Sequence, residues 1–152
     1  MKKNLDTIRC ECGKVKYTIK GMPLFRAYCH CSICQKYNQK PYGDIVLFQA
    51  KDIETSTDAK VDYESYKFPW ILHRGTCRAC SKPTIEHLKV FPIPKIIIVP
   101  AHNISEETYL VKPSIHIFYD TRVEDIKDGL PKYSGYLKSQ FAFSKKILTS
   151  LI

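Results

Sequence analysis

The sequence predicts a mainly β fold that holds metal ions. Short segments of alternating or continuous apolar residues recur along the 152 residues, and nine prolines break the chain between them. Aromatic residues, which favour strands, make up 12% of the chain. All seven cysteines fall into three tight groups, a spacing typical of metal ligands. No repeat or Gly/Ser-rich linker divides the chain, so one domain of ordinary size is expected.

Several segments have the pattern of a strand. Residues 14–20 alternate polar and apolar side chains with a period of two, which predicts a half-buried strand. Residues 45–48 and 96–99 are short, continuous apolar runs of the kind found in buried strands. Residues 61–64 and 115–119 alternate again. Segments this short indicate sheets whose strands are joined by turns.

Helix is predicted only in short stretches before the C-terminal tail. Residues 32–39 follow a cysteine group and stop before Pro41, which leaves room for one or two turns. Residues 124–129 are predicted to form another short helical turn.

The C-terminal tail, residues 137–152, fits more than one structure. Its apolar residues with near-helical spacing are Leu137, Phe141, Leu148 and Leu151. Phe141 and Phe143, however, alternate as in a strand. The lysines of the tail also allow a basic amphipathic segment at a membrane surface, but we expect a terminus that is docked or frayed.

The cysteines are predicted to bind metal rather than to form disulfides. A disulfide framework needs an oxidising compartment and normally an even number of cysteines, and this chain has seven. The basic residues 1–7 are followed by no apolar signal region, and no apolar run approaches the ~20 residues of a membrane span. We therefore expect a cytoplasmic protein without a membrane segment, whose thiols are reduced or metallated.

The spacing of the cysteines predicts two zinc ions per chain. Cys29, Cys31 and Cys34 lie close enough for one loop to bring all three thiolates to one ion. The remaining cysteines form two natural pairs for a closed four-thiolate site: Cys10 with Cys12, and Cys77 with Cys80. The rival partition, in which consecutive groups share ligands, stays open at this stage.

Three thiolates leave one position of a tetrahedral zinc ion open, as a catalytic site requires. Such a zinc is thiophilic and suits the sulfur of a substrate better than a water nucleophile. The alternative is that His30, another side chain or water fills the fourth position, so that both ions only hold the fold.

The cysteine groups resemble those of the glutathione-dependent formaldehyde-activating enzyme (GFA) family, also called the centromere protein V domain. The resemblance covers residues 7–134 and rests on three motifs. These are Cys-Glu-Cys-Gly at 10–13, Cys-His-Cys-Ser-Ile-Cys at 29–34 and Cys-Arg-Ala-Cys at 77–80. Less specific likeness extends over residues 97–101 and 114–133.

The resemblance implies a β-rich, Mss4-like fold of small coiled sheets with two zinc ions. It implies that Cys10, Cys12, Cys77 and Cys80 are structural ligands, and that Cys29, Cys31 and Cys34 form the catalytic site. The activity implied is the joining of formaldehyde to glutathione, which is a carbon–sulfur lyase reaction in reverse. A GFA-like domain is then expected over residues 1–136, with 137–152 as a tail that docks on it.

The chain departs from the family pattern at two places. Residues 36–42, after Cys34, are bulky and charged where members have small residues, which predicts a cleft of different shape. Ser81 stands where the family has a glycine that would ease a left-handed turn. Lys36, Lys40 and Arg74 lie beside the cysteine groups in sequence and are candidates to bind the carboxylates of glutathione or a related thiol.

The leading hypothesis is therefore a zinc-dependent enzyme that acts on a small-molecule thiol adduct. The alternative is a non-catalytic zinc module that binds nucleic acid, cytoskeleton or a protein. The formal net charge of +9 attracts anions of any kind and does not decide between them. Nucleic acid is an unlikely partner, because few aromatic residues lie next to basic ones.

Overall fold

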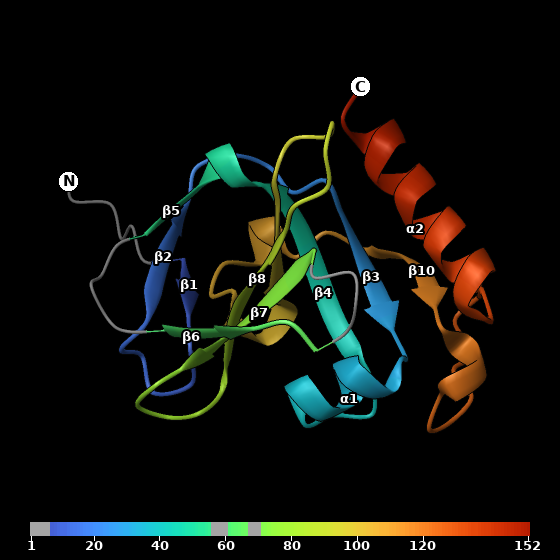
Figure 1. Ribbon diagram of the computed structural model, residues 1–152, viewed down its shortest axis with the longest axis horizontal. Coiled ribbons are helices and arrows are strands. Elements are labelled where there is room, and N and C mark those ends of the chain that lie inside the picture. Colours follow the sequence, from blue (N-terminus) through green and yellow to red (C-terminus); the bar gives the residue numbers. More distant parts are fainter. Residues whose placement is uncertain (1–6, 56–60, 67–70) are drawn as a thin grey trace.

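Two β-sheets and two α-helices make up the part of the fold that the structure describes (Figure 1). The computed structural model describes residues 7–55, 61–66 and 71–152. Within these residues the small sheet has the strand order β1 (Ile8–Arg9), β2 (Lys16–Ile19), β5 (Ile53–Thr55). The large sheet has the order β10 (Pro113–Ile117), β3 (Phe25–Cys29), β4 (Gly43–Gln49), β9 (Ile96–Pro100), β8 (Pro83–Leu88), β7 (Leu72–Cys77), β6 (Val61–Glu64).

The helices are α1 (Ser32–Asn38), between β3 and β4, and α2 (Tyr136–Ser150) at the C-terminus. Short 3-10 turns follow four of the strands and loops: η1 (Ala50–Asp52), η2 (Ala101–Asn103), η3 (Glu107–Tyr109) and η4 (Tyr119–Thr121). All strand pairs are antiparallel except that of β10 with β3, which is parallel, among the residues the structure describes. The mainly β fold class is therefore confirmed.

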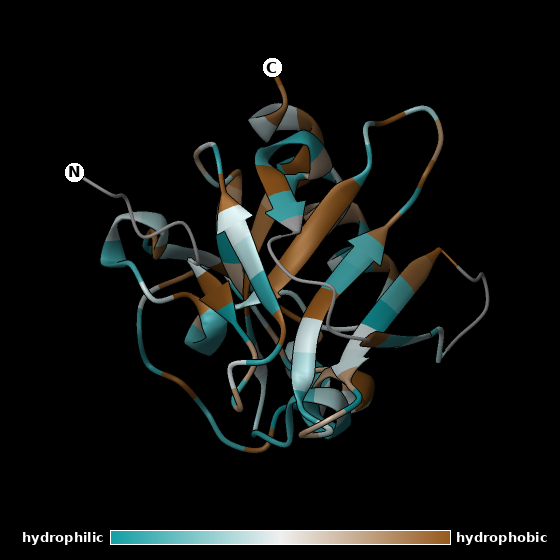
Figure 2. Ribbon diagram, turned by 90° about the vertical axis from the view of Figure 1, so that its left-hand side faces the viewer, coloured by the Kyte–Doolittle hydropathy of each residue, from teal (hydrophilic) through white to brown (hydrophobic). Residues whose placement is uncertain are grey.

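The central strands of the large sheet are buried on both faces. Along β4, Ile45 and Leu47 belong to one hydrophobic core, whereas Val46 and Phe48 belong to the other. The first core lies on the α2 side and the second on the side of the small sheet. Two-sided burial explains why β4 and β9 are continuous apolar runs. Figure 2 shows such hydrophobic strands in the interior of the fold.

Helix α2 docks on the large sheet through one face. Ser139 and Ile147 are buried, and Phe143 packs edge-on against Phe25 of β3 at 5.7 Å between ring centroids. The Ser139 hydroxyl accepts a hydrogen bond of 2.8 Å from the Phe118 backbone N–H. The opposite face leaves Phe141 71% exposed. The tail is thus a docked helix, and the domain boundary at residue 136 stays a prediction.

The strand segments expected from the sequence appear as β2, β4, β6, β9 and β10, and the helix at 32–39 appears as α1. The helical turn predicted at 124–129 is wrong, since these residues form an irregular loop. Polar side chains accept hydrogen bonds from backbone N–H groups that would otherwise donate within a helix. The Leu130 N–H donates to the Asp128 carboxylate, and the Ile126 N–H donates to the Tyr119 hydroxyl. Neither helix of the described residues has the length and hydropathy of a membrane crossing.

Candidate metal and thiol-binding site

Four cysteines meet where two turns face each other, and we call them the four-thiol cluster: Cys10, Cys12, Cys77 and Cys80. The first pair lies in the turn between β1 and β2, and the second lies at the end of β7 and in the turn that follows. Gly13, with φ of 79°, makes the first turn, and Ser81 takes φ of 60° in the second. This left-handed conformation is unfavourable for serine, so the expectation that glycine would ease the turn is confirmed.

The sulfur separations in the four-thiol cluster fit a tetrahedral zinc site. Zinc–sulfur bonds of about 2.3 Å place tetrahedral thiolates about 3.8 Å apart. The Sγ atoms of Cys10 and Cys12 lie 3.5 Å apart, and those of Cys12 and Cys77 lie 3.8 Å apart. All four sulfurs lie within 4.8 Å of one another, and none forms a disulfide.

The remaining cysteines, Cys29, Cys31 and Cys34, form the three-thiol cluster. One short segment positions all of them, because β3 ends at Cys29 and α1 begins after Cys31, its N-cap. The Cys31 Sγ accepts a hydrogen bond from the Cys34 backbone N–H at 3.2 Å. The Cys29 Sγ lies 3.4 Å from that of Cys31 and 3.1 Å from that of Cys34. The structure thus brings together the four-plus-three partition expected from the sequence.

Within the three-thiol cluster, negative charge is favoured on Cys31 alone. Hydrogen bonds with the neighbouring thiols and burial raise the pKa of Cys29. Although its hydrogen bond with Cys29 opposes the shift, the pKa of Cys34 is also raised, by Cys31 and by burial. Hydrogen bonds from the Cys29 and Cys34 thiols lower the pKa of Cys31 to about 3, and the nearby Arg74 guanidinium acts in the same direction. Thiolate is the form that binds a metal ion, so this donor set fits zinc.

A buried ion pair lies against the three-thiol cluster. The Arg74 guanidinium approaches the Cys34 Sγ at 3.8 Å, and its Nε lies 2.9 Å from Glu86 Oε1. Both residues are buried, and the guanidinium also lies near the rings of Tyr37 and Tyr66. Burial raises the pKa of Glu86 to about 7, although Arg74 opposes the shift. The guanidinium thus offsets negative charge that collects on the thiols and on Glu86.

A cavity of about 720 Å³ opens beside the three-thiol cluster. The cluster, Arg74 and Glu86 line one part of it, and strands β4, β7, β8, β9 and β10 supply much of the rest. Helix α2 forms another wall with Phe143, Ile147 and Leu148. No residue of the four-thiol cluster is among the described residues that line the cavity. A ligand in this cavity would therefore meet the three-thiol cluster alone.

Only one of the three cations that the sequence suggested for substrate binding lines the cavity. Arg74 lines the cavity, whereas Lys36 and Lys40 are exposed and do not. None of residues 36–42 lines it. The bulky loop after Cys34 therefore does not shape this cavity as the sequence suggested. Helix α2 forms a wall of the cavity that the sequence did not predict.

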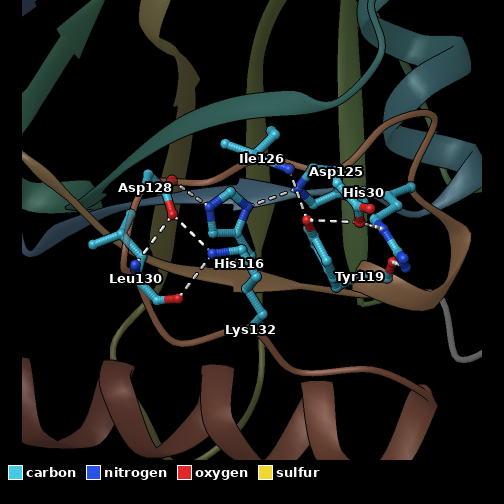
Figure 3. A network of polar contacts seen from close by, with 9 residues as sticks. His30, His116, Tyr119, Asp125, Ile126, Asp128, Leu130 and Lys132 are labelled. Carbon is cyan, nitrogen blue, oxygen red and sulfur yellow. Dashed lines mark hydrogen bonds and ion pairs between the residues drawn. The ribbon is translucent and has the colours of Figure 1, made fainter.

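A histidine network beside the three-thiol cluster was also not identified from the sequence (Figure 3). The Nε2 of His30 lies 2.8 Å from the Nδ1 of His116, whose Nε2 lies 2.6 Å from the Asp128 carboxylate. Lys132 donates to the same carboxylate at 2.9 Å. His30 and His116 are 86 residues apart, and no local spacing connects them.

The network fixes the orientation of His30. A proton on His116 Nε2 donates to Asp128, so His116 Nδ1 accepts the proton of His30 Nε2. Burial and the neighbouring His116 lower the pKa of His30 to about 4, which keeps it neutral. The ring is thus held by His116, and His30 is not part of either cysteine cluster. His30, one of the alternatives for the fourth position, is therefore not grouped with the three thiols.

Comparisons with known proteins agree with the cysteine pattern and the fold. A family model described as glutathione-dependent formaldehyde-activating enzyme matches residues 6–121. The crystal structure of a Rhodobacter sphaeroides protein superposes with a TM-score of 0.55 at 15% sequence identity. The match covers 84% of this chain and 99% of that chain, and at this identity it supports the fold alone. No curated protein matches the chain.

Proposed function

Because the chain belongs to the glutathione-dependent formaldehyde-activating enzyme family, we propose that it is a zinc-dependent enzyme acting on a thiol adduct. The reaction is of the carbon–sulfur lyase type, in which a thiol and an aldehyde join or separate. S-hydroxymethylglutathione is the adduct that the family description suggests.

One observation carries this proposal: the three-thiol cluster lines a cavity, and the four-thiol cluster does not. A closed four-thiolate site has no position for a substrate, whereas a three-thiolate site has one. Cys29, Cys31 and Cys34 line a cavity large enough for a small molecule, so a fourth ligand of an ion held there could come from that side. This arrangement favours an enzyme over a module in which both metal sites are structural.

The two clusters would hold two zinc ions per chain. Bound to Cys29, Cys31 and Cys34, zinc would supply a thiophilic centre that stabilises a substrate sulfur as thiolate. Arg74, 3.8 Å from the Cys34 Sγ, would offset the negative charge of this thiolate-rich site. The apolar walls would exclude water and so protect the adduct from competing reactions.

The proposed reaction cleaves an S-hydroxymethyl thiol into a thiol and formaldehyde, with no change of oxidation state overall. In cleavage of an S-hydroxymethyl thiol, the carbon–sulfur bond breaks and its electron pair stays on sulfur. The hydroxyl oxygen forms the carbonyl of formaldehyde as its proton leaves to a base or to water. Asp120 and Glu86 are carboxyl groups on the cavity wall that could receive this proton.

We predict that two zinc ions bind per chain. Elemental analysis of protein purified with zinc supplied should give about two equivalents, because each cluster presents a complete set of thiolates. Cys31→Ser should reduce the content to about one. A wild-type content near one would show that only one cluster holds zinc.

The activity is tested by exchange between formaldehyde and thiol adducts. Zinc-loaded protein should accelerate the exchange of an S-hydroxymethyl thiol with free formaldehyde, measured by exchange NMR. Cys34→Ser should abolish the acceleration, because it removes a ligand of the three-thiol cluster. A folded, zinc-loaded wild-type protein that accelerates no adduct would favour the non-catalytic module.

A further inference from the structure

The cavity beside the three-thiol cluster is mostly apolar. Isoleucine, leucine, valine and phenylalanine side chains from five strands and α2 form most of its described wall. Ile45, Leu88 and Ile98 are buried core residues whose side chains also face this space. Charged and thiol groups meet at the three-thiol cluster, where Arg74 and Glu86 lie, and a smaller number of polar side chains, among them Asp120, Gln140 and Ser144, line the cavity elsewhere. A ligand would therefore have a small reactive head and a larger apolar body.

The cavity offers little to an anionic peptide thiol. Arg74 is the one cation among the described residues that line it, and its guanidinium is engaged by Glu86 and Cys34. The wall also carries the carboxyl groups of Glu86 and Asp120. Glutathione would bring two more carboxylates and a charged amine into this space. Charged groups without partners bind poorly in apolar surroundings, so the cavity disfavours glutathione itself.

One side of the apolar wall is supplied by a part of the chain outside the family match. The family model ends at residue 121, and α2 begins at Tyr136. Three residues of α2, Phe143, Ile147 and Leu148, line the cavity opposite the sheet. Helix α2 therefore extends an apolar wall, most of which comes from the shared family region.

We propose that the cavity binds thiols, or thiol adducts, with an alkyl or aryl body, whose sulfur lies at the three-thiol cluster. This inference rests on the proposed function for the position of the sulfur and deepens it by naming the substrate class. The apolar body lies between the sheet and α2, out of water.

The size of the cavity sets how the binding affinity should depend on the length of the thiol's alkyl chain. About 720 Å³ lies in the range of pockets that enclose small organic ligands. Each methylene moved from water into an apolar wall is expected to tighten binding about fourfold. Affinity should therefore rise steadily along a series of straight-chain thiols until the cavity is filled.

The test is titration calorimetry on the zinc-loaded protein under oxygen-free conditions. The probes are 1-butanethiol, 1-pentanethiol, 1-hexanethiol and glutathione, with 1-hexanol as a control that has the same body without sulfur. Affinity should increase about fourfold per methylene, and hexanethiol should bind more tightly than glutathione. Hexanol should bind several-fold more weakly than hexanethiol, because it cannot place sulfur at the cluster.

A pair of α2 variants tests the position of the body. Leu148→Gln places an amide on the cavity wall and should weaken hexanethiol binding several-fold. Leu148 is 53% exposed, so the substitution should leave the fold intact. The matched control is Leu137→Gln, on the same helix, where the side chain is 81% exposed and does not line the cavity. It should bind hexanethiol as the wild type does.

The outcomes separate this inference from the proposed function. Affinity that is flat with chain length, with glutathione binding most tightly, would overturn the apolar substrate class and leave the proposed enzyme intact. Equal affinity for hexanol and hexanethiol, with chain-length dependence retained, would show that sulfur does not reach the cluster. That result would overturn the proposed function and the sulfur position, while supporting the apolar selectivity of the cavity.

Discussion

The four-thiol and three-thiol clusters use the same side chain in different surroundings. The four-thiol cluster joins two turns from distant parts of the chain and packs at the edge of the core between the sheets. The three-thiol cluster comes from one strand, one loop and one helix, and it faces a cavity and a buried ion pair. The comparison teaches that the same ligand type can stand in a closed set of four or beside a cavity in a set of three, and we propose that this difference separates a structural site from a substrate site.

The largest expected difference between the clusters is in stability. Cys77→Ser should unfold the protein or nearly so, because structural zinc couples ~10 kcal/mol or more of binding free energy to folding. That figure is comparable with the whole stability of a domain. Cys34→Ser should leave a folded protein with one zinc ion. Circular dichroism and urea unfolding of both variants make the comparison, and equal loss of fold would overturn the proposed division of roles.

The ion pair beside the three-thiol cluster should give the next largest effect. Arg74→Met removes the partner of a buried carboxyl group and should lower the free energy of unfolding by about 3–5 kcal/mol. The double variant Arg74→Met with Glu86→Gln should regain most of this loss, because no buried charge is left unpaired. Urea unfolding of the single and double variants measures both effects. A double variant no more stable than Arg74→Met would show that Arg74 stabilises the fold through the thiols instead.

The smallest expected effect concerns the turn of the four-thiol cluster. Ser81→Gly should raise stability by up to about 1 kcal/mol, because glycine adopts the left-handed conformation without the steric cost that serine bears. The matched control is Ser105→Gly, since the φ of Ser105 is not positive and the substitution should not stabilise. Thermal unfolding of both variants gives the comparison. A Ser81→Gly variant less stable than the wild type would mean that the serine side chain supports the turn.

The sequence could predict elements whose pattern reflects their own burial. The sequence of β2 alternates polar and apolar residues, and the sequences of β4 and β9 are apolar runs, so each indicates how the strand is buried. The cysteine spacing likewise indicated both clusters. Strand β8 has no such burial pattern in its sequence, because it carries the buried Glu86, whose charge is offset by Arg74 of β7. Pairing across strands is a tertiary property that a single segment does not reveal.

The tail illustrates the same limit. Leu137, Phe141 and Leu148 had near-helical spacing, yet all are more than half exposed in α2. The helix docks through Ser139, Phe143 and Ile147, spaced four residues apart, and the serine on this face weakened the apolar pattern. The cavity beside the three-thiol cluster could not be predicted for a related reason, since its walls come from segments that meet only in the folded protein.

The ligands of the two clusters are separated by different lengths of chain, and this difference sets an order of events during synthesis. Cys29, Cys31 and Cys34 leave the ribosome almost together and can gather around an ion with little loss of chain entropy. The four-thiol cluster must wait for Cys80. The outer edge of β3, where Cys29 pairs with Ile117 of β10, stays open even longer. An ion taken up early by the three-thiol loop would therefore remain more open to the solvent until β10 and α2, which line the cavity, have been made.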